Sequence, residues 1–310
     1  MIVAVAALTS AWIAGALALV LLALPVASVA RLLPPRQARI GALLWALAAA
    51  AGLVVSGTVL VLAPQWAAHP LLYTPHLERP LPHLCLLGAA RWWLGVELIR
   101  ALTLAALGLM AAGLTRLALG LGRTRAVAAT LRELPPLHGA LDPHVFVADD
   151  ARGGSTTVGL LRPRVVVSRA LAEELAPDAR AAVISHEQCH IRWRDPLARL
   201  ALSAVAVAWP VPGLLVLHEW TRMSELAADW QAVTRVGAQA WRDALAALDR
   251  DGGTAEERLR RVEHPAAGSA GWMAAAASWS FLGAAALALY GRTALLSVVC
   301  LFETVLTSWQ

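Results

Sequence analysis

Residues 181–195 read Ala181-Ala-Val-Ile-Ser-His186-Glu187-Gln-Cys-His190-Ile-Arg-Trp-Arg-Asp195. The spacing of His186 and His190 predicts a helix with both imidazoles on one face, because positions i and i+4 lie one turn apart. Two such imidazoles can bind one zinc ion, with Glu187 beside them to act on a water molecule at the metal. Chance also produces such short patterns, so the alternative is a surface helix that carries two histidines and a glutamate.

The composition is typical of a membrane protein. Hydrophobic residues make up 58% of the 310 residues and charged residues only 15%, which is far too apolar for an ordinary soluble domain. Four stretches carry no charge at all: residues 2–30, 40–63, 101–115 and 271–291. Each stretch, with its flanks, is long enough to cross the hydrocarbon layer as a helix. The sequence therefore predicts a multi-pass α-helical membrane protein.

The positions of the arginines predict the orientation of these helices. Residues 31–39 contain three arginines and no acid, and a second cluster follows the third apolar stretch at Arg116, Arg123, Arg125 and Arg132. Because cytoplasmic loops carry an excess of positive charge, both clusters indicate the cytoplasmic side of the cell membrane. The N-terminus and the proline-rich loop 64–90 are then extracytoplasmic. The histidines of that loop could bind a metal or a ligand, or could simply lie at the membrane interface.

The chain divides into three parts. Residues 1–125 contain the N-terminal membrane helices, at about 2–30, 40–63 and 91–120, with the extracytoplasmic loop 64–90. Residues 126–265 form a small cytoplasmic α+β unit with a strand at 145–150, a hairpin at 156–168, a short helix capped by Ser168, and a helix that begins near Pro177. The hairpin could offer an edge to an extended peptide. Residues 266–310 form a C-terminal membrane helix and a short tail.

A membrane-associated hairpin at 197–218 is expected to bring a pair of acidic residues back to the motif of His186, Glu187 and His190. Trp209-Pro-Val-Pro-Gly213 interrupts an apolar segment, so a path that returns to the same side is favoured over a single crossing. Glu225 and Asp229 then lie four apart on one helical face. A zinc hydrolase needs one more protein ligand and leaves the fourth position open, and Glu225 is the best-placed carboxylate. Asp229 would accept the N–H of a ligand imidazole. The alternative is a solvated acidic face.

Three strings of residues carry a family resemblance. They are Gly159-Leu-Leu-Arg-Pro-Arg-Val-Val-Val-Ser168, the segment from Ser185 to Asp195, and Arg222-x-x-Glu225-x-x-Ala228-Asp229. Together they resemble the M56 peptidases, membrane zinc proteases that include the BlaR/MecR antibiotic-sensing proteins and are similar in active-site plan to the CAAX prenyl proteases and HtpX. The resemblance covers residues 130–235 in motifs and residues 1–290 in the order of membrane helices. It implies a gluzincin (zincin-like) metalloprotease domain with one Zn²⁺ per chain, bound by His186, His190 and Glu225, and with Glu187 as the general base.

Two further residues of the motif helix receive structural roles. Asp195 matches a position that M56 peptidases usually fill with aspartate, and we expect it to steer Arg192 or Arg194. Cys189 lies inside the motif but off the face that carries the histidines. A small, packed residue is therefore expected there, rather than a redox switch.

The expected reaction is hydrolysis of a peptide bond. Glu187 would take the proton of a water molecule and pass it to the leaving amine. A separate donor is usually needed to stabilise the oxyanion, and the candidates by position in the sequence are His218, Arg222 and His264. Each of these residues also has an ordinary structural explanation.

The family resemblance suggests a protein substrate, for example a winged-helix repressor of the BlaI type, and hence a regulatory protease. The alternatives are quality control of membrane proteins by the same chemistry, or a non-catalytic receptor or scaffold with a structural zinc site. The intact Glu187 argues against the last, because a structural site needs no base. The chain ends at Gln310, without the sensor that follows the last membrane helix of the antibiotic receptors, so β-lactam sensing is not expected. Direct binding of nucleic acid is not expected either, since no basic run is interleaved with aromatic residues.

Overall fold

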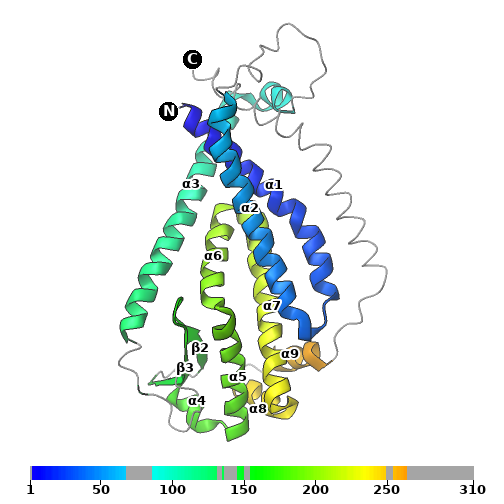
Figure 1. Ribbon diagram of the computed structural model, residues 1–310, viewed down its shortest axis with the longest axis vertical. Helices are drawn as coiled ribbons and strands as arrows, with labels where there is room; N and C mark the ends of the chain where they lie inside the picture. Colours follow the sequence, from blue (N-terminus) through cyan, green and yellow to red (C-terminus); the bar gives the residue numbers. More distant parts are fainter. Residues whose placement is uncertain are drawn as a thin grey trace.

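The computed structural model describes residues 2–67, 86–130, 135, 145–149, 154–248 and 254–263. Long helices make up one half of the molecule, and a small sheet with shorter helices makes up the other half (Figure 1). Two helices, α6 and α7, pass from one half into the other and connect them (Figure 1). The motif helix therefore lies at the end of the long-helix bundle.

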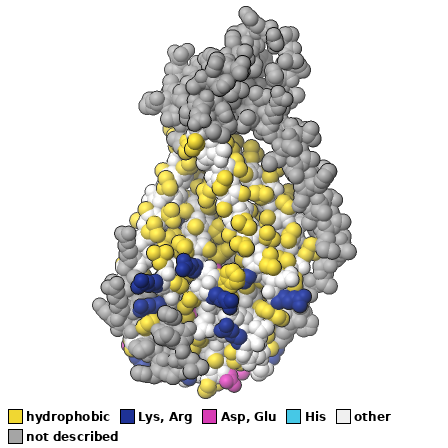
Figure 2. Space-filling model, viewed as in Figure 1, with side chains coloured by type: hydrophobic (Ala, Val, Ile, Leu, Met, Phe, Trp, Pro, Cys, Tyr) yellow, Lys and Arg dark blue, Asp and Glu magenta, His cyan; other side chains and the backbone are white. Residues whose placement is uncertain are grey.

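Three apolar helices form the N-terminal part: α1 (Ile2–Leu32), α2 (Ala38–Ala67) and α3 (Leu86–Thr130). Each contains a segment long and apolar enough to cross a membrane, at Ala11–Leu32, Pro35–Val61 and Leu104–Thr124. Many large apolar side chains of these helices point outward, as at Leu104, which is 70% exposed, and Val54, which is 66% exposed, whereas Leu19 and Trp45 are buried. Figure 2 shows this apolar surface, with arginine side chains gathered below it. The prediction of membrane-spanning segments in this part is confirmed to that extent.

Helices α2 and α3 are longer than the sequence predicted. The expected loop 64–90 begins later, because α2 runs to Ala67, and ends earlier, because α3 starts at Leu86; the residues between lie outside the described part of the chain. At its other end α3 continues past residue 120 to Thr130. The arginines that end the apolar stretch do not end the helix, because arginine and alanine are both good helix formers.

The sheet confirms the predicted strand and hairpin. Strands β2 (Ser155–Val158) and β3 (Arg164–Ser168) pair antiparallel, and β1 (Val145–Ala148) pairs with β3 in parallel. The strand order is β1-β3-β2. The β2–β3 turn begins at Gly159, whose φ of +95° favours glycine. Strand β2 therefore forms an edge of the sheet among the described strands.

Helices α4 (Arg169–Glu174) and α5 (Pro177–Trp193) pack on this sheet. Helix α8 (Ala238–Leu248) packs on α5 and α7, and α9 (Thr254–Glu263) packs on α7 and α8. Ser168 caps α4 as predicted, because its hydroxyl accepts the N–H of Leu171 at 3.2 Å. A common apolar core joins the sheet to the helices and includes Val165, Val183 and Trp241. This core fixes the motif helix α5 against the sheet.

The predicted hairpin at 197–218 is a pair of helices, α6 (Asp195–Ala208) and α7 (Pro210–Val236), that run in opposite directions (Figure 1). The chain reverses at Trp209, and α7 packs closely on α6 because Gly213 has no side chain; a Cβ there would lie 2.6 Å from the carbonyl oxygen of Val205. The tip is held to α1, where Trp12 donates to the Ala208 carbonyl at 2.6 Å. The returning path is therefore confirmed, whereas its association with a membrane stays a prediction.

The predicted C-terminal membrane helix at 271–291, the tail to residue 310 and His264 lie outside the described residues. The three-part division into residues 1–125, 126–265 and 266–310 stays a prediction. What the structure does show is where the sheet begins and that α6 and α7 pack among the N-terminal helices, with α2 against α7 and α3 against α6.

Candidate active site

Helix α5 places both motif histidines on one face. Pro177 begins the helix at a position where its missing N–H leaves no hydrogen bond unmade. The helix ends at Trp193, and the next residue, Arg194, has a φ of 54°, in the left-handed region. His186 and Glu187 are buried. The ring of His190, one turn further on, meets the ring of His186 edge-on with 4.9 Å between the centroids.

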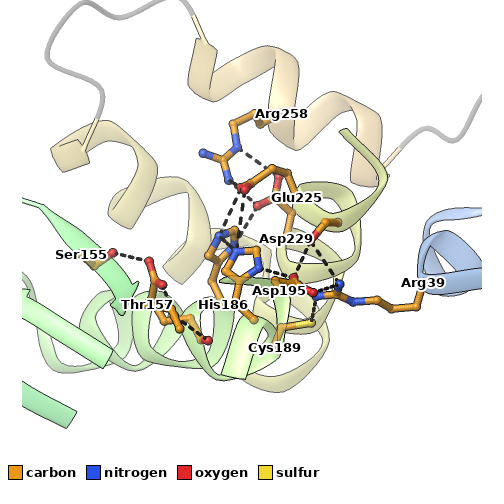
Figure 3. A network of polar contacts seen from close by, with 12 residues as sticks. Arg39, Ser155, Thr157, His186, Cys189, Asp195, Glu225, Asp229 and Arg258 are labelled. Carbon is orange, nitrogen blue, oxygen red and sulfur yellow. Dashed lines mark hydrogen bonds and ion pairs between the residues drawn. The ribbon is translucent and has the colours of Figure 1, made fainter. Parts of the chain in front are cut away.

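Three donor atoms converge from two helices. The Nε2 atoms of His186 and His190 are 3.1 Å apart. Glu225 of α7 brings one carboxylate oxygen to 3.5 Å from the first nitrogen and the other to 3.8 Å from the second. Ligand atoms around a tetrahedral zinc ion lie roughly 3.3 Å apart, given metal–ligand bonds near 2 Å. The three side chains therefore fit a single metal ion, as the sequence predicted for this set (Figure 3).

An aspartate and an arginine stand behind His186. Its Nδ1 lies 3.0 Å from Asp229 Oδ1, a close contact whose angle falls outside that of a regular hydrogen bond. Asp229 is in turn held by Arg258 of α9, which donates from Nη2 at 2.6 Å and from Nε at 3.1 Å. The ring of His186 also stacks on Trp241, with 5.0 Å between the centroids. Contact between Asp229 and a ligand imidazole was predicted, and the structure places these atoms together.

A second aspartate and a second arginine stand behind His190. Its Nδ1 lies 2.6 Å from Asp195 Oδ2. Asp195 also pairs with Arg39 of α2, with 2.8 Å between the Arg39 nitrogens and each carboxylate oxygen, and accepts the hydroxyl hydrogen of Ser224. The expectation that Asp195 steers Arg192 or Arg194 is not what the structure shows. At the start of α6, the carboxylate turns inward to His190, and Arg192 and Arg194 are exposed.

Glu187 is oriented by the edge strand β2. Ser155 donates to one carboxylate oxygen at 2.9 Å, and Thr157 donates to the other at 2.7 Å (Figure 3). Both hydroxyls come from the strand that forms the edge of the sheet. A carboxylate held at both oxygens keeps a fixed direction relative to the two histidines.

Burial and neighbouring charges set the protonation of this site. Burial disfavours a charged imidazole, yet the carboxylates of Asp229 and Glu225 raise the pKa of His186 to about 9. Burial likewise favours a neutral Glu225, but its contacts with His186 and the charges of His190 and Arg258 lower its pKa to about 2. Burial opposes ionisation of Asp195 as well, and its bonds to His190, Arg39 and Ser224 lower its pKa overall. Glu225 and Asp195 are therefore charged at neutral pH, and Glu225 is suited to hold a cation.

The site opens into a cavity of about 680 Å³. Its lining includes the three metal-binding candidates, Glu187, Arg258, the whole of β2 and parts of α3 and α6. His218 and Arg222, predicted as candidates to stabilise the oxyanion, do not line this cavity. His218 is exposed, and Arg222 pairs with Glu219 one turn earlier on α7 at 2.8 Å. The third candidate, His264, lies outside the described residues.

Several residues of the site carried no signal in the sequence. Ser155 and Thr157 belong to an ordinary β-branched run, and Arg258 is one of several arginines on a strongly charged helix. Arg39 was counted only as part of a positive cluster that orients the membrane helices. Cys189 behaves as predicted, since it is buried and packed, and its thiol accepts a hydrogen bond from Arg39 at 3.2 Å.

Comparison with known proteins agrees with this geometry. Residues 153–245 match the family model described as BlaR1 peptidase M56. This part of the chain is therefore similar to the M56 peptidases. It contains β2, the motif helix and the Glu225 helix, and so covers every residue of the site except Arg39 and Arg258. Searches of curated proteins and of solved structures returned no match. The family is one of peptidases, which agrees with the expected hydrolytic chemistry.

Proposed function

We propose that this chain is a membrane-embedded zinc metalloendopeptidase with a gluzincin-type domain. The observation that carries the proposal is the convergence of His186, His190 and Glu225 on one point beside Glu187, in a cavity with an edge strand along its wall. Two imidazoles and one carboxylate are a ligand set of hydrolytic zinc sites, which keep a fourth position open. The match to the M56 peptidases supports the same chemistry.

Each residue of the site has its own role in the proposed hydrolysis. When bound, the zinc ion supplies a Lewis acid that lowers the pKa of a water molecule and polarises the scissile carbonyl. Glu187 takes the proton of that water and returns it to the leaving amine. Ser155 and Thr157 keep its carboxylate in place, and Asp229 and Asp195 keep the two ligand rings in place.

The wall formed by β2 supports a protein substrate in extended form. An extended peptide can add to the edge of a sheet through main-chain hydrogen bonds, and Ser155–Val158 lines the cavity beside Glu187. A peptide held there would pass its backbone along the residues that orient the base. We therefore propose cleavage within an unfolded or flexible segment of a cytoplasmic or membrane protein.

The proposed setting is the cell membrane, with an extracytoplasmic N-terminus and the site on the cytoplasmic side. Three helices can cross a bilayer by length and composition, and the arginine clusters supply the orientation. A site on that side can reach cytoplasmic regulators, so we propose regulatory proteolysis, for example of a winged-helix repressor.

The test is a comparison of the full chain with its Glu187→Gln variant, both purified in lipid nanodiscs. Zinc content is measured by elemental analysis, and cleavage is measured on casein and on a winged-helix repressor of the BlaI type. We expect both proteins to hold one zinc ion and the variant to lose cleavage by about 10²-fold or more, because a general base contributes on that scale. Equal cleavage by both proteins would rule out Glu187 as the base.

Two other results separate the alternatives. Zinc binding without cleavage of any substrate by the unmodified chain would favour a receptor or scaffold with a structural metal. Cleavage of casein and of misfolded membrane proteins, with the repressor left intact, would favour quality control over regulation.

A further inference from the structure

Arg39 connects the first turn of helix α2 to the histidine pair. It lies 156 positions before Asp195 in the sequence, and its two terminal nitrogens grip both oxygens of that carboxylate at 2.8 Å. Only 13% of the Arg39 side chain and 9% of the Asp195 side chain are exposed. A two-pronged pair of this kind fixes the plane of the carboxylate, which the single point charge of a lysine does not do.

The guanidinium of Arg39 is surrounded by the helices of the site. It donates to Ser224 Oγ of α7 at 3.1 Å and to Cys189 Sγ of α5 at 3.2 Å (Figure 3). It also lies 5.6 Å from the centre of the Trp193 ring. With Asp195 at the start of α6, this one side chain contacts three helices of the site, α5, α6 and α7. The neighbouring Arg36, on the same turn, is exposed.

We propose that Arg39 is a positioning residue for His190, acting through Asp195. Asp195 Oδ2 lies 2.6 Å from His190 Nδ1, so the direction of this carboxylate sets the direction of the imidazole and of its free Nε2. Without the guanidinium, the carboxylate loses the partner that holds both its oxygens and can turn away from the ring. The inference rests on the proposed function, in which His190 is a metal ligand.

The proposal gives the apolar helices a part in the chemistry. Arg39 lies outside the segment that matches the M56 model, in the first turn of α2, which follows the tight turn Pro35–Gln37 between α1 and α2. A displacement of α1 and α2 would therefore move the guanidinium that holds Asp195 and, through Asp195, the imidazole of His190. This places a point of control between the membrane part and the metal site.

The experiment uses the full chain in nanodiscs, in the Glu187→Gln background so that no cleavage occurs during the measurement. Co²⁺ serves as a spectroscopic probe, with affinity measured by chelator competition and geometry by the visible absorption spectrum. The variants are Arg39→Gln, Arg39→Lys and, as the matched control from the same turn, Arg36→Gln. We expect Arg39→Gln to bind Co²⁺ roughly 10–100-fold more weakly with an altered spectrum, as for other residues that orient a metal ligand. We expect Arg39→Lys to have a Co²⁺ affinity between those of the parent protein and Arg39→Gln. We expect Arg36→Gln to have the affinity and the spectrum of the parent protein.

The results with these variants support or overturn the role of Arg39 in positioning His190. An Arg39→Gln variant with the parent's affinity and spectrum overturns the inference. If that variant does not fold, Arg39→Lys decides by its spectrum, because it keeps the charge and the aliphatic stem; loss of the fold in both shows that Arg39 supports the fold rather than the site. A parent protein that binds no Co²⁺ contradicts the proposed function itself, whereas tight binding that is indifferent to residue 39 contradicts only this inference.

Discussion

Single side chains set the geometry of this site through two chains of three residues each. Each ligand imidazole meets an aspartate, and each aspartate is held by an arginine from an element outside the motif: His186, Asp229 and Arg258 on one side, His190, Asp195 and Arg39 on the other. Because the Nδ1 atom of each ring faces an aspartate, both Nε2 atoms face the same point. The arrangement is suited to a metal that needs oriented nitrogen donors.

Thr157 gives a prediction for the base. We expect Thr157→Val to lower kcat roughly tenfold with little change in KM, since a hydrogen bond to a charged group contributes about 1.5–3 kcal/mol and Thr157 donates to Glu187 at 2.7 Å. Steady-state kinetics on a peptide substrate measures both constants. Thr156→Val is the control, because Thr156 precedes it on the same strand with an exposed side chain. An equal loss in both variants would show damage to the strand instead.

Protonation of His186 predicts how metal binding depends on pH. The pKa of His186 in the metal-free protein is about 9, and a proton on this ring competes with a metal ion. Affinity for zinc should therefore rise with pH up to about 9 and level off above it. Calorimetry in buffers of different ionisation enthalpy would report the release of a proton on binding at neutral pH. Binding without proton release would contradict the shift.

The pKa shifts of His186 and Glu225 predict how the stability of the metal-free protein depends on pH. His186 has its pKa raised from 6.5 to about 9, so its contribution is complete below pH 6.5 and is lost as the pH rises through 9. Glu225 has its pKa lowered from 4.5 to about 2, so its contribution is complete above pH 4.5 and is lost as the pH falls through 2. Unfolding midpoints across this range should be highest between pH 4.5 and 6.5 as far as these two groups are concerned. A Glu225→Gln variant should lose less stability as the pH rises through 9, because the Glu225 carboxylate is one of the groups that raise the pKa of His186.

At the level of elements, the α6–α7 hairpin brings Glu225 to the motif helix. We expect Gly213→Ala to destabilise the protein by about 1–3 kcal/mol, the usual cost of overpacking, because the new Cβ would lie 2.6 Å from the Val205 carbonyl oxygen. Denaturant unfolding in nanodiscs measures the change. Gly122→Ala is the control, since a Cβ there meets nothing within 4 Å. Similar stability for both variants would mean that the two helices can separate without loss.

At the scale of the whole molecule, the proposed orientation in the membrane can be tested by labelling cysteines. Cys85 falls in the loop expected outside the cell, and Cys189 is buried. In a Cys300→Ser background, a maleimide reagent that cannot cross membranes should therefore label intact cells at Cys85. A Cys85→Ser version of the same protein is the control and should stay unlabelled. Labelling that appears only after the cells are opened would reverse the proposed orientation and place the site outside.

Much of this molecule followed from the sequence because the signals were local. Helical spacing placed His186 and His190 on one face, and two prolines and a glycine turned the chain back at Trp209. The β-branched runs on either side of Pro163 formed the hairpin. Such features depend on the backbone preferences of a few neighbouring residues, which a sequence displays directly. The ends of α2 and α3 were less clear, since a change from apolar to charged residues does not stop a helix.

The tertiary structure alone decided what surrounds the ligands. Arg39 and Asp195 are 156 positions apart, and Arg258 and Asp229 come from different helices. Because the chain contains many arginines, the sequence does not indicate which arginine pairs with which aspartate. Which guanidinium reaches which buried carboxylate depends on how whole helices pack. The sequence by itself thus determined the candidate metal-binding residues and the path that joins them, whereas packing determined which side chains hold those residues in place.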